Sequence, residues 1–169
     1  MKTAVALACL LWAAAALPAE TYMLLVEQRL DGQEDPAAPA GLQGLMSGMF
    51  DRGQVTFDSG PYRPAADWDR LEFRESLNLA REGLAHYLAT VRFEASSTPA
   101  DAGEAPAYAV RVAFQLWSAY DGSMLGEGEL SVDNLGREGE LRYEALLFKA
   151  GESAAAELEA LAARSRRPQ

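Results

Sequence analysis

The longest regular pattern of apolar and polar positions in this chain runs from Ala107 to Val132. Every second residue from Tyr108 to Leu116 is apolar or aromatic, which is the period of a strand with one buried face. The pair Asp121-Gly122 is typical of a tight two-residue turn, because such a turn needs residues that tolerate a positive φ. Met124 to Val132 is therefore expected to run back antiparallel, and this long hairpin is the centre of the predicted fold.

Three other stretches have the pattern of strands. Thr21 to Leu30 is apolar on both faces, which is typical of a central strand. The pattern of Gln54 to Asp58 predicts a short strand, which ends at Ser59-Gly60-Pro61. From His86 onward the period is two, with Tyr87 to Glu94 as another strand, and the small-residue segment from Ser96 to Pro106 is expected to be a loop.

Three stretches instead repeat their apolar residues with the spacing of an amphipathic helix. Asp69 and Glu72 fit a capping box at the start of the second helix, and Gly83 is expected to end it. The last stretch predicts one long helix, with the alternative of a short strand from Glu140 to Lys149 and a helix from Glu152. The three predicted stripes are Leu42, Leu45, Met46, Met49 and Phe50; Phe73, Leu77, Ala80 and Leu84; and Leu147, Gly151, Ala154, Leu158 and Leu161.

The order of these elements is strand, helix, short strand, helix, strand, hairpin, helix. This order predicts an α/β (α+β) domain with a mixed sheet of four to five strands, a long antiparallel hairpin and about three packed helices. Residues 20–169 are long enough to form one domain with a single core.

The first nineteen residues are interpreted as an export signal. Lys2 provides the positive start, Ala4 to Ala16 an apolar segment too short to span a bilayer, and Leu17-Pro18-Ala19 a cleavage site. We therefore expect a periplasmic or secreted protein without a transmembrane helix after signal removal. A lipid anchor at Cys9 is the alternative, but the segment before Cys9 is short for a lipoprotein signal, and alanine stands where leucine is usual.

Three stretches resemble a family of bacterial envelope domains that includes the amino-terminal domain of TolB, the curli subunit CsgG and the lipoprotein activators of penicillin-binding proteins. Glu82 to Val91 (EGLAHYLATV) is similar to the family's helix end, glycine and following strand, and Leu116 to Leu125 is similar to its hairpin. The closing helix matches in position. The chain departs from the family at Thr90 and Arg92, in place of a usual glycine. The resemblance implies the fold and an envelope setting, but fold does not fix function.

Charge and side-chain chemistry argue against several classes of function. The formal charge of −10 argues against a nucleic-acid partner, since phosphate binding depends on Lys and Arg. The chain has one histidine, His86, and its one cysteine lies in the export signal, so the parts of serine, cysteine and zinc sites are missing. We expect no catalytic residue, no cofactor and no metal. The acids Glu127 and Glu129 are interpreted as solvent-facing charges on an edge strand.

Aromatic residues are the candidate interaction sites: Trp68, which lies between two aspartates, and Trp117 and Tyr120 on the hairpin. They support a non-enzymatic exported protein that acts as an interaction or assembly accessory module for an unidentified envelope protein. The alternative is a small-molecule or glycan binder with a pocket between the first helix and the sheet, lined by Met46 and Met49. A third hypothesis is a hydrolase with a carboxylate pair.

Overall fold

The sheet is built around β1 (Thr21–Leu30), a strand that pairs with other strands along both of its edges. The structure is a computed structural model, and it describes residues 19–35, 39–58, 70–98, 107–133 and 142–166. The other strands are β2 (Gln33–Glu34), β3 (Val55–Asp58), β4 (Tyr87–Thr98), β5 (Ala107–Ser118) and β6 (Met124–Asp133), and the helices are α2 (Ala40–Asp51), α3 (Arg70–Glu82) and α4 (Tyr143–Ser165).

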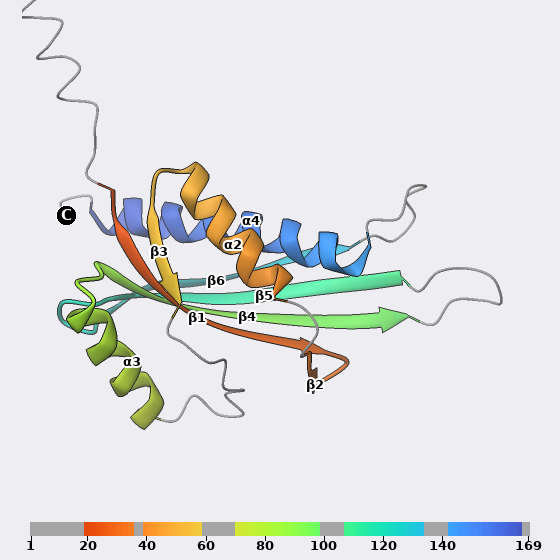
Figure 1. Cartoon of the computed structure of the whole chain (residues 1–169), viewed down its shortest axis with the longest axis horizontal. Helices are drawn as coiled ribbons and strands as arrows, with labels where there is room; N and C mark the ends of the chain where they lie inside the picture. Colours follow the sequence, from red (N-terminus) through yellow and green to blue (C-terminus); the bar gives the residue numbers. More distant parts are fainter. Residues whose placement is uncertain (1–18, 36–38, 59–69, 99–106, 134–141, 167–169) are drawn as a thin grey trace, which may run out of the picture.

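Within the described residues the strands form one mixed sheet in the order β2-β1-β4-β5-β6, with β3 also paired to β1 (Figure 1). The pairs β1–β3 and β1–β4 are parallel, and the other pairs are antiparallel. The predicted α/β class, with its mixed sheet and long hairpin, is confirmed. The two-residue strand β2 was not predicted, because two residues are too short to show a period.

Helices α2 and α4 lie together on one face of the sheet and cover the main core (Figure 1). Tyr22, Phe93 and Leu116 point into this core from the sheet, and Leu45 and Leu158 point into it from the helices. All five side chains are fully buried. Apolar and polar side chains therefore alternate along β4 and β5 because one face of each strand packs against helices, as the sequence indicated.

Glycines bring the main chains of α2 and α4 into direct contact. A β-carbon at Gly44 would overlap the backbone carbonyl of Phe148, and one at Gly151 would overlap the backbone carbonyl of Gly41. Gly151 lies inside the continuous helix α4, which runs from Tyr143 to Ser165. The alternative of a strand from Glu140 to Lys149 is therefore wrong. Close packing offsets the cost of about 1 kcal/mol that glycine carries in a helix relative to alanine.

The opposite face of the sheet is covered by α3 at one end. A second, smaller core forms there from Met23, Leu77, Ala80, Leu88 and Ala119. Farther along the same face, the side chains carry alternating charges in register across the strands. One row is Glu27, Arg92, Ala113 and Glu129, and the next row is Arg29, Glu94, Arg111 and Ser131.

Several predicted details need correction. Phe50, placed on the inner stripe of α2, is 78% exposed. The helix begins at Ala40 and buries Gly41, Gly44 and Gly48, so its inner face is rotated toward the glycines. Strand β4 continues to Thr98 because every residue from Tyr87 pairs with β5, so the predicted loop from Ser96 begins too early.

The hairpin turn is also longer than predicted. Strand β5 ends at Ser118 and β6 begins at Met124, so the connection has five residues rather than two. Gly122 has the expected positive φ of 77°. A register shift between Leu116 and Trp117 accompanies the turn, because a bulge adds a residue to one strand near the end of the ladder.

The start of β1 and the end of α4 lie side by side (Figure 1), and an ion pair of 3.1 Å joins Glu20 to Arg166. The proposed export signal and the capping residue Asp69 lie outside the described residues. Among the helices that are described, none combines the length and the low polarity needed to cross a membrane.

Candidate interaction surface

Helix α3 and the β5–β6 hairpin meet at one end of the molecule. The Arg81 Nε donates a hydrogen bond of 2.8 Å to the carbonyl of Ala119, and the backbone N–H of Ala119 donates one of 3.0 Å to the carbonyl of His86. A β-carbon at Gly122 would lie 2.9 Å from Leu77, so the turn touches the helix. These contacts hold the hairpin tip and the segment after α3 together as one rigid end.

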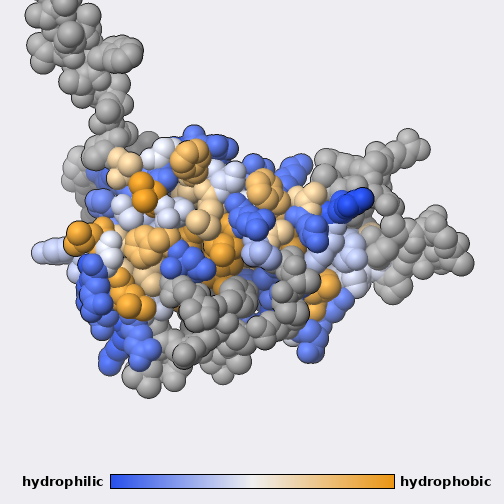
Figure 2. All heavy atoms as spheres, in the orientation of Figure 1, coloured by the Kyte–Doolittle hydropathy of each residue, from blue (hydrophilic) through white to orange (hydrophobic). Residues whose placement is uncertain are grey.

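Apolar side chains are exposed at this end. Tyr120 at the hairpin tip is 92% exposed, and Leu84 after α3 is 83% exposed. Met124 at the start of β6 and Leu79 on α3 are each 49% exposed. Figure 2 shows apolar atoms at the left-hand end of the molecule, where α3 and the hairpin lie in Figure 1. We name these four residues the hairpin-end surface.

Leu84 has an unusual backbone conformation. Its φ is +56°, in the left-handed region that favours glycine. The N–H of Ala85 bonds the carbonyl of Ala80, and the N–H of Leu84 bonds the carbonyl of Arg81, which is the bonding pattern of a Schellman motif. Leucine therefore occupies the position where glycine is the favoured residue.

The glycine that was expected to end α3 has a different role. The helix ends at Glu82, one residue before Gly83, as predicted. A β-carbon at Gly83 would lie 2.8 Å from the Phe57 ring, so this position needs glycine for space, while the positive φ falls on Leu84. The predicted inner stripe of α3 is wrong at Leu84, because the turn directs that side chain to solvent.

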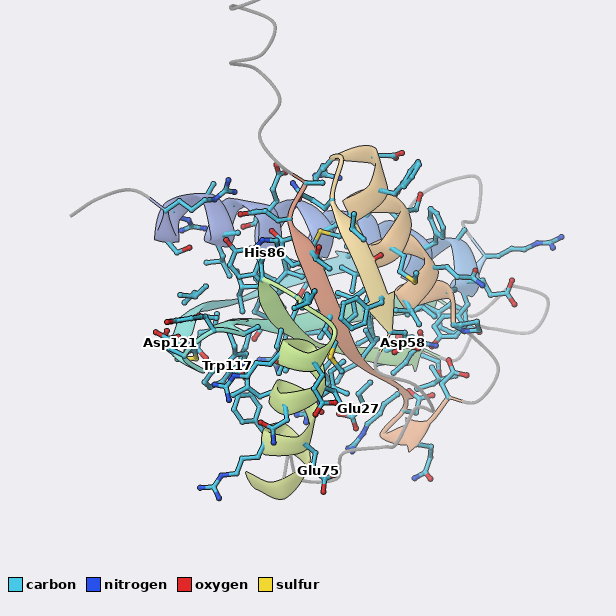
Figure 3. All side chains as sticks on the ribbon, turned by 60° about the vertical axis from the view of Figure 1, so that its left-hand side comes forward. Glu27, Asp58, Glu75, His86, Trp117 and Asp121 are labelled. Carbon is cyan, nitrogen blue, oxygen red and sulfur yellow. The ribbon has the colours of Figure 1, made fainter. Side chains whose placement is uncertain are left out.

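The hairpin tip is held by Asp121. Its carboxylate accepts hydrogen bonds from the N–H of Ser123 (3.0 Å) and the Ser123 hydroxyl (2.8 Å). The backbone bond from Ser123, then the side-chain bonds with Ser118 and Ser123, lower the pKa of Asp121 to about 2. The tip therefore presents Tyr120 on an ordered turn, which reduces the conformational entropy that a partner has to overcome. Figure 3 shows Asp121 at this tip.

The three aromatic candidates fall in different environments. Tyr120 is on the hairpin-end surface. Trp117 is half-buried beside α3, where its ring centre lies 4.6 Å from that of Phe73 (Figure 3). Its Nε1 is buried and has no hydrogen-bond partner among the described residues. Trp68 lies outside the described residues. Leu84 lies on the segment that the bond between Ala119 and His86 joins to the hairpin, and sequence reasoning missed it because its spacing fits a helix stripe.

His86 ties two strands together. Its Nδ1 accepts a hydrogen bond of 3.0 Å from the backbone N–H of Thr21. This nitrogen therefore carries a lone pair directed at the backbone. The histidine caps the start of the β1–β4 ladder.

Two buried carboxylates are both neutralised by neighbours. Glu20 accepts hydrogen bonds from the hydroxyls of Tyr22 (3.2 Å) and Tyr87 (2.9 Å) and pairs with Arg166. Burial and then the bond to Glu20 raise the pKa of Tyr87 to about 12; burial also raises the pKa of Tyr22. These four residues link the start of β1 to the end of α4.

The second buried carboxylate, Glu27, lies on the opposite face of the sheet. It is 1% exposed and pairs with Arg29 (2.6 Å) and Arg92 (2.7 Å). Glu20 and Glu27 do not converge, because Glu20 bonds the hydroxyls of Tyr22 and Tyr87 in the main core, whereas Glu27 lies on the opposite face of the sheet. Among the described residues, no group of three or more His, Cys, Asp or Glu side chains could hold a metal ion.

The pocket expected between the first helix and the sheet is occupied by packed side chains. Met49 is fully buried in the main core, and Met46 packs against it. A depression of about 420 Å³ lies instead on the opposite, charged face of the sheet, over Ala113. Its residues come from β4, β5 and β6.

Comparison with known proteins gives similarities only among solved structures. No family model and no curated protein matches the chain. It is similar to the PelC dodecamer from Paraburkholderia phytofirmans (17% identity, TM-score 0.48, covering 89% of both chains). It is also similar to lipoprotein GNA1162 from Neisseria meningitidis (14%, 0.42, covering 86% of this chain and 99% of the other). A third similar structure is the LpoB C-terminal domain from Escherichia coli (13% identity, TM-score 0.43, covering 74% of this chain and 90% of the other).

At TM-scores and identities this low, these similarities assign neither a family nor a function to the chain. One of these structures, GNA1162, is a lipoprotein by its name, as are the penicillin-binding-protein activators in the resemblance stated above. The resemblance to TolB and CsgG stays a prediction.

Proposed function

We propose that this chain is a non-enzymatic protein of the bacterial cell envelope that binds another envelope protein through the hairpin-end surface. The observation that carries the proposal is Leu84, which combines a positive φ with 83% exposure. A left-handed conformation costs a residue with a β-carbon roughly 1–2 kcal/mol. Because this leucine is exposed, packing within the chain does not offset that cost. The side chain is therefore expected to serve an interaction with another molecule.

Tyr120 supports the same surface. Tyrosine is frequent at protein interfaces because it supplies a large apolar ring with one polar group and few rotatable bonds. Here it projects from a turn that Asp121 and the bond from Arg81 to Ala119 keep in place. A partner with an apolar pocket would therefore meet a preorganised aromatic side chain beside an exposed leucine.

The setting in the envelope rests on the predicted export signal in residues 1–19, with Lys2 followed by the apolar run from Ala4 to Ala16. The non-enzymatic part rests on side-chain chemistry. His86 bonds the backbone of Thr21, and the buried acids Glu20 and Glu27 are paired with arginines, with Glu20 also accepting a hydrogen bond from Tyr87.

The test is site-specific photo-crosslinking in living cells. A photoreactive phenylalanine analogue replaces Tyr120 in the full chain, and the matched control places it at Phe50, which is 78% exposed at the end of α2 on the other side of the sheet. We expect one dominant envelope protein to be captured from position 120 and not from position 50. Equal capture from both positions, or none above an unrelated exported protein, would contradict the proposal.

A further inference from the structure

The charged face of the sheet contains a depression whose floor is the side chain of Ala113. In register across the strands, Ala113 stands between Arg92 on β4 and Glu129 on β6. A methyl group between two long side chains leaves a hollow, and its volume of about 420 Å³ is within the usual range of small-ligand sites. The polar groups around it are Thr90, Arg92, Gln115, Glu127 and Glu129.

One wall of the depression has a fixed cation. Glu27, which is buried on the neighbouring strand β1, accepts a hydrogen bond from Arg29 through one carboxylate oxygen and one from the Arg92 Nε through the other. In the part of the chain that the structure describes, Nε is the only nitrogen of Arg92 that is hydrogen-bonded, and the side chain is 32% exposed. Its two terminal nitrogens are therefore available to an anion.

The opposite wall has carboxylates. Glu129 is paired with Arg111. Glu127 accepts one hydrogen bond, of 3.2 Å, from the neutral amide of Gln115 and forms no ion pair within the described residues. Arg92 and Glu127 are thus an oriented cation and an uncompensated anion on opposite sides of Ala113.

We propose that this depression binds a short zwitterionic molecule of dipeptide size, with its carboxylate on Arg92 and its ammonium group on Glu127. Two strand spacings, about 9.5 Å, separate the backbones of β4 and β6. A two-residue peptide spans about 7 Å, which leaves room for the side chains to reach both of its ends. Guanidinium and carboxylate form paired, charge-assisted hydrogen bonds, so a ligand with one charge of each sign satisfies both walls. This site lies apart from the hairpin-end surface and does not depend on the proposed function.

The first test uses L-alanyl-L-alanine with the purified protein, with calorimetry for affinity and amide chemical shifts for location. The N-acetylated and the C-amidated dipeptides are the controls, because each lacks one charge. We expect shifts at Thr90, Ala113 and Gln115, and a loss of affinity of about tenfold or more for either blocked peptide. Equal binding of all three peptides, or no shift at these residues, would overturn the proposal.

Two variants test the site without disturbing Glu27. Ala113→Leu fills the depression and is expected to abolish binding. Ala109→Leu, on the same strand and face but outside the depression, is the matched control and should bind normally.

Glu127→Gln removes the anionic wall. In this variant the free and the N-acetylated dipeptide should bind with the same affinity, since the ammonium group has lost its partner. A persistent preference for the free ammonium group would show that Glu127 does not recognise it.

Discussion

Gly44 of α2 packs directly against the backbone carbonyl of Phe148 in α4, with no room for a β-carbon between them. The two helices therefore touch main chain to main chain on one face of the sheet. Helix α4 also contacts β5 and β6, whereas the tip of the hairpin contacts α3 through Gly122 and Leu77.

Replacing Gly44 by alanine is expected to destabilise the protein although alanine is the better helix former. The overlap with Phe148 forces the helices apart, and overpacking of this kind costs about 1–3 kcal/mol. Urea denaturation followed by circular dichroism measures the change. Gln43→Ala, at an exposed position of the same helix, is the control, and unchanged or increased stability of Gly44→Ala would show that the helices can separate freely.

Replacing Leu84 by glycine should have opposite effects on stability and on binding. Glycine adopts the positive φ of this position without strain, so the free energy of unfolding should rise by about 1 kcal/mol. Loss of the exposed side chain should weaken the cross-link captured from position 120. If the variant is less stable, leucine contributes to the fold and the central observation behind the proposed function fails.

Removing the charge of Glu27 should be strongly destabilising. Glu27→Ala leaves Arg29 and Arg92 without their buried counter-ion, and breaking a buried pair in this way costs about 3–5 kcal/mol. Chemical denaturation should be compared with Glu129→Ala, which breaks an exposed ion pair on the same face and should change stability far less. Equal losses of stability in the two variants would show that the buried ion pairs of Glu27 contribute no more than the exposed pair of Glu129.

The hairpin tip should remain ordered until strongly acidic pH. Hydrogen bonds from Ser123 and Ser118 lower the pKa of Asp121 from 3.8 to about 2. A group with a lowered pKa in the folded state stabilises the fold above its unfolded pKa and loses that contribution as the pH falls from about 4 toward 2. Carboxyl chemical shifts measured against pH should show Asp121 titrating near 2. A midpoint near 3.8 would mean that the turn bonds do not form in solution.

Strands β4 and β5 could be predicted from the sequence because one face of each is buried. Tyr87 to Glu94 and Tyr108 to Leu116 alternate since their inner side chains meet α2 and α4. Phe50 was misplaced because an apolar stripe does not reveal that glycines, which carry no hydrophobic signal, form the contact between two helices.

The candidate surface was only partly predictable. Tyr120 could be chosen from the sequence because a hairpin turn is exposed. Leu84 fits a helix stripe, and its exposure follows from a left-handed turn that local periodicity does not show. The depression over Ala113 depends on register between strands that lie far apart in the sequence, so no local pattern predicts Arg92 opposite Ala113 and Glu129.

By itself, the sequence determined the class of fold, the long hairpin and the burial of one face of β4 and of β5. These features arise from short-range periodicity and from the free energy of removing apolar side chains from water. Only the tertiary structure decided which helix faces meet, where Leu84 points and which charges stand side by side on the open face. Such features depend on long-range register and on close packing, which no single segment of the chain contains.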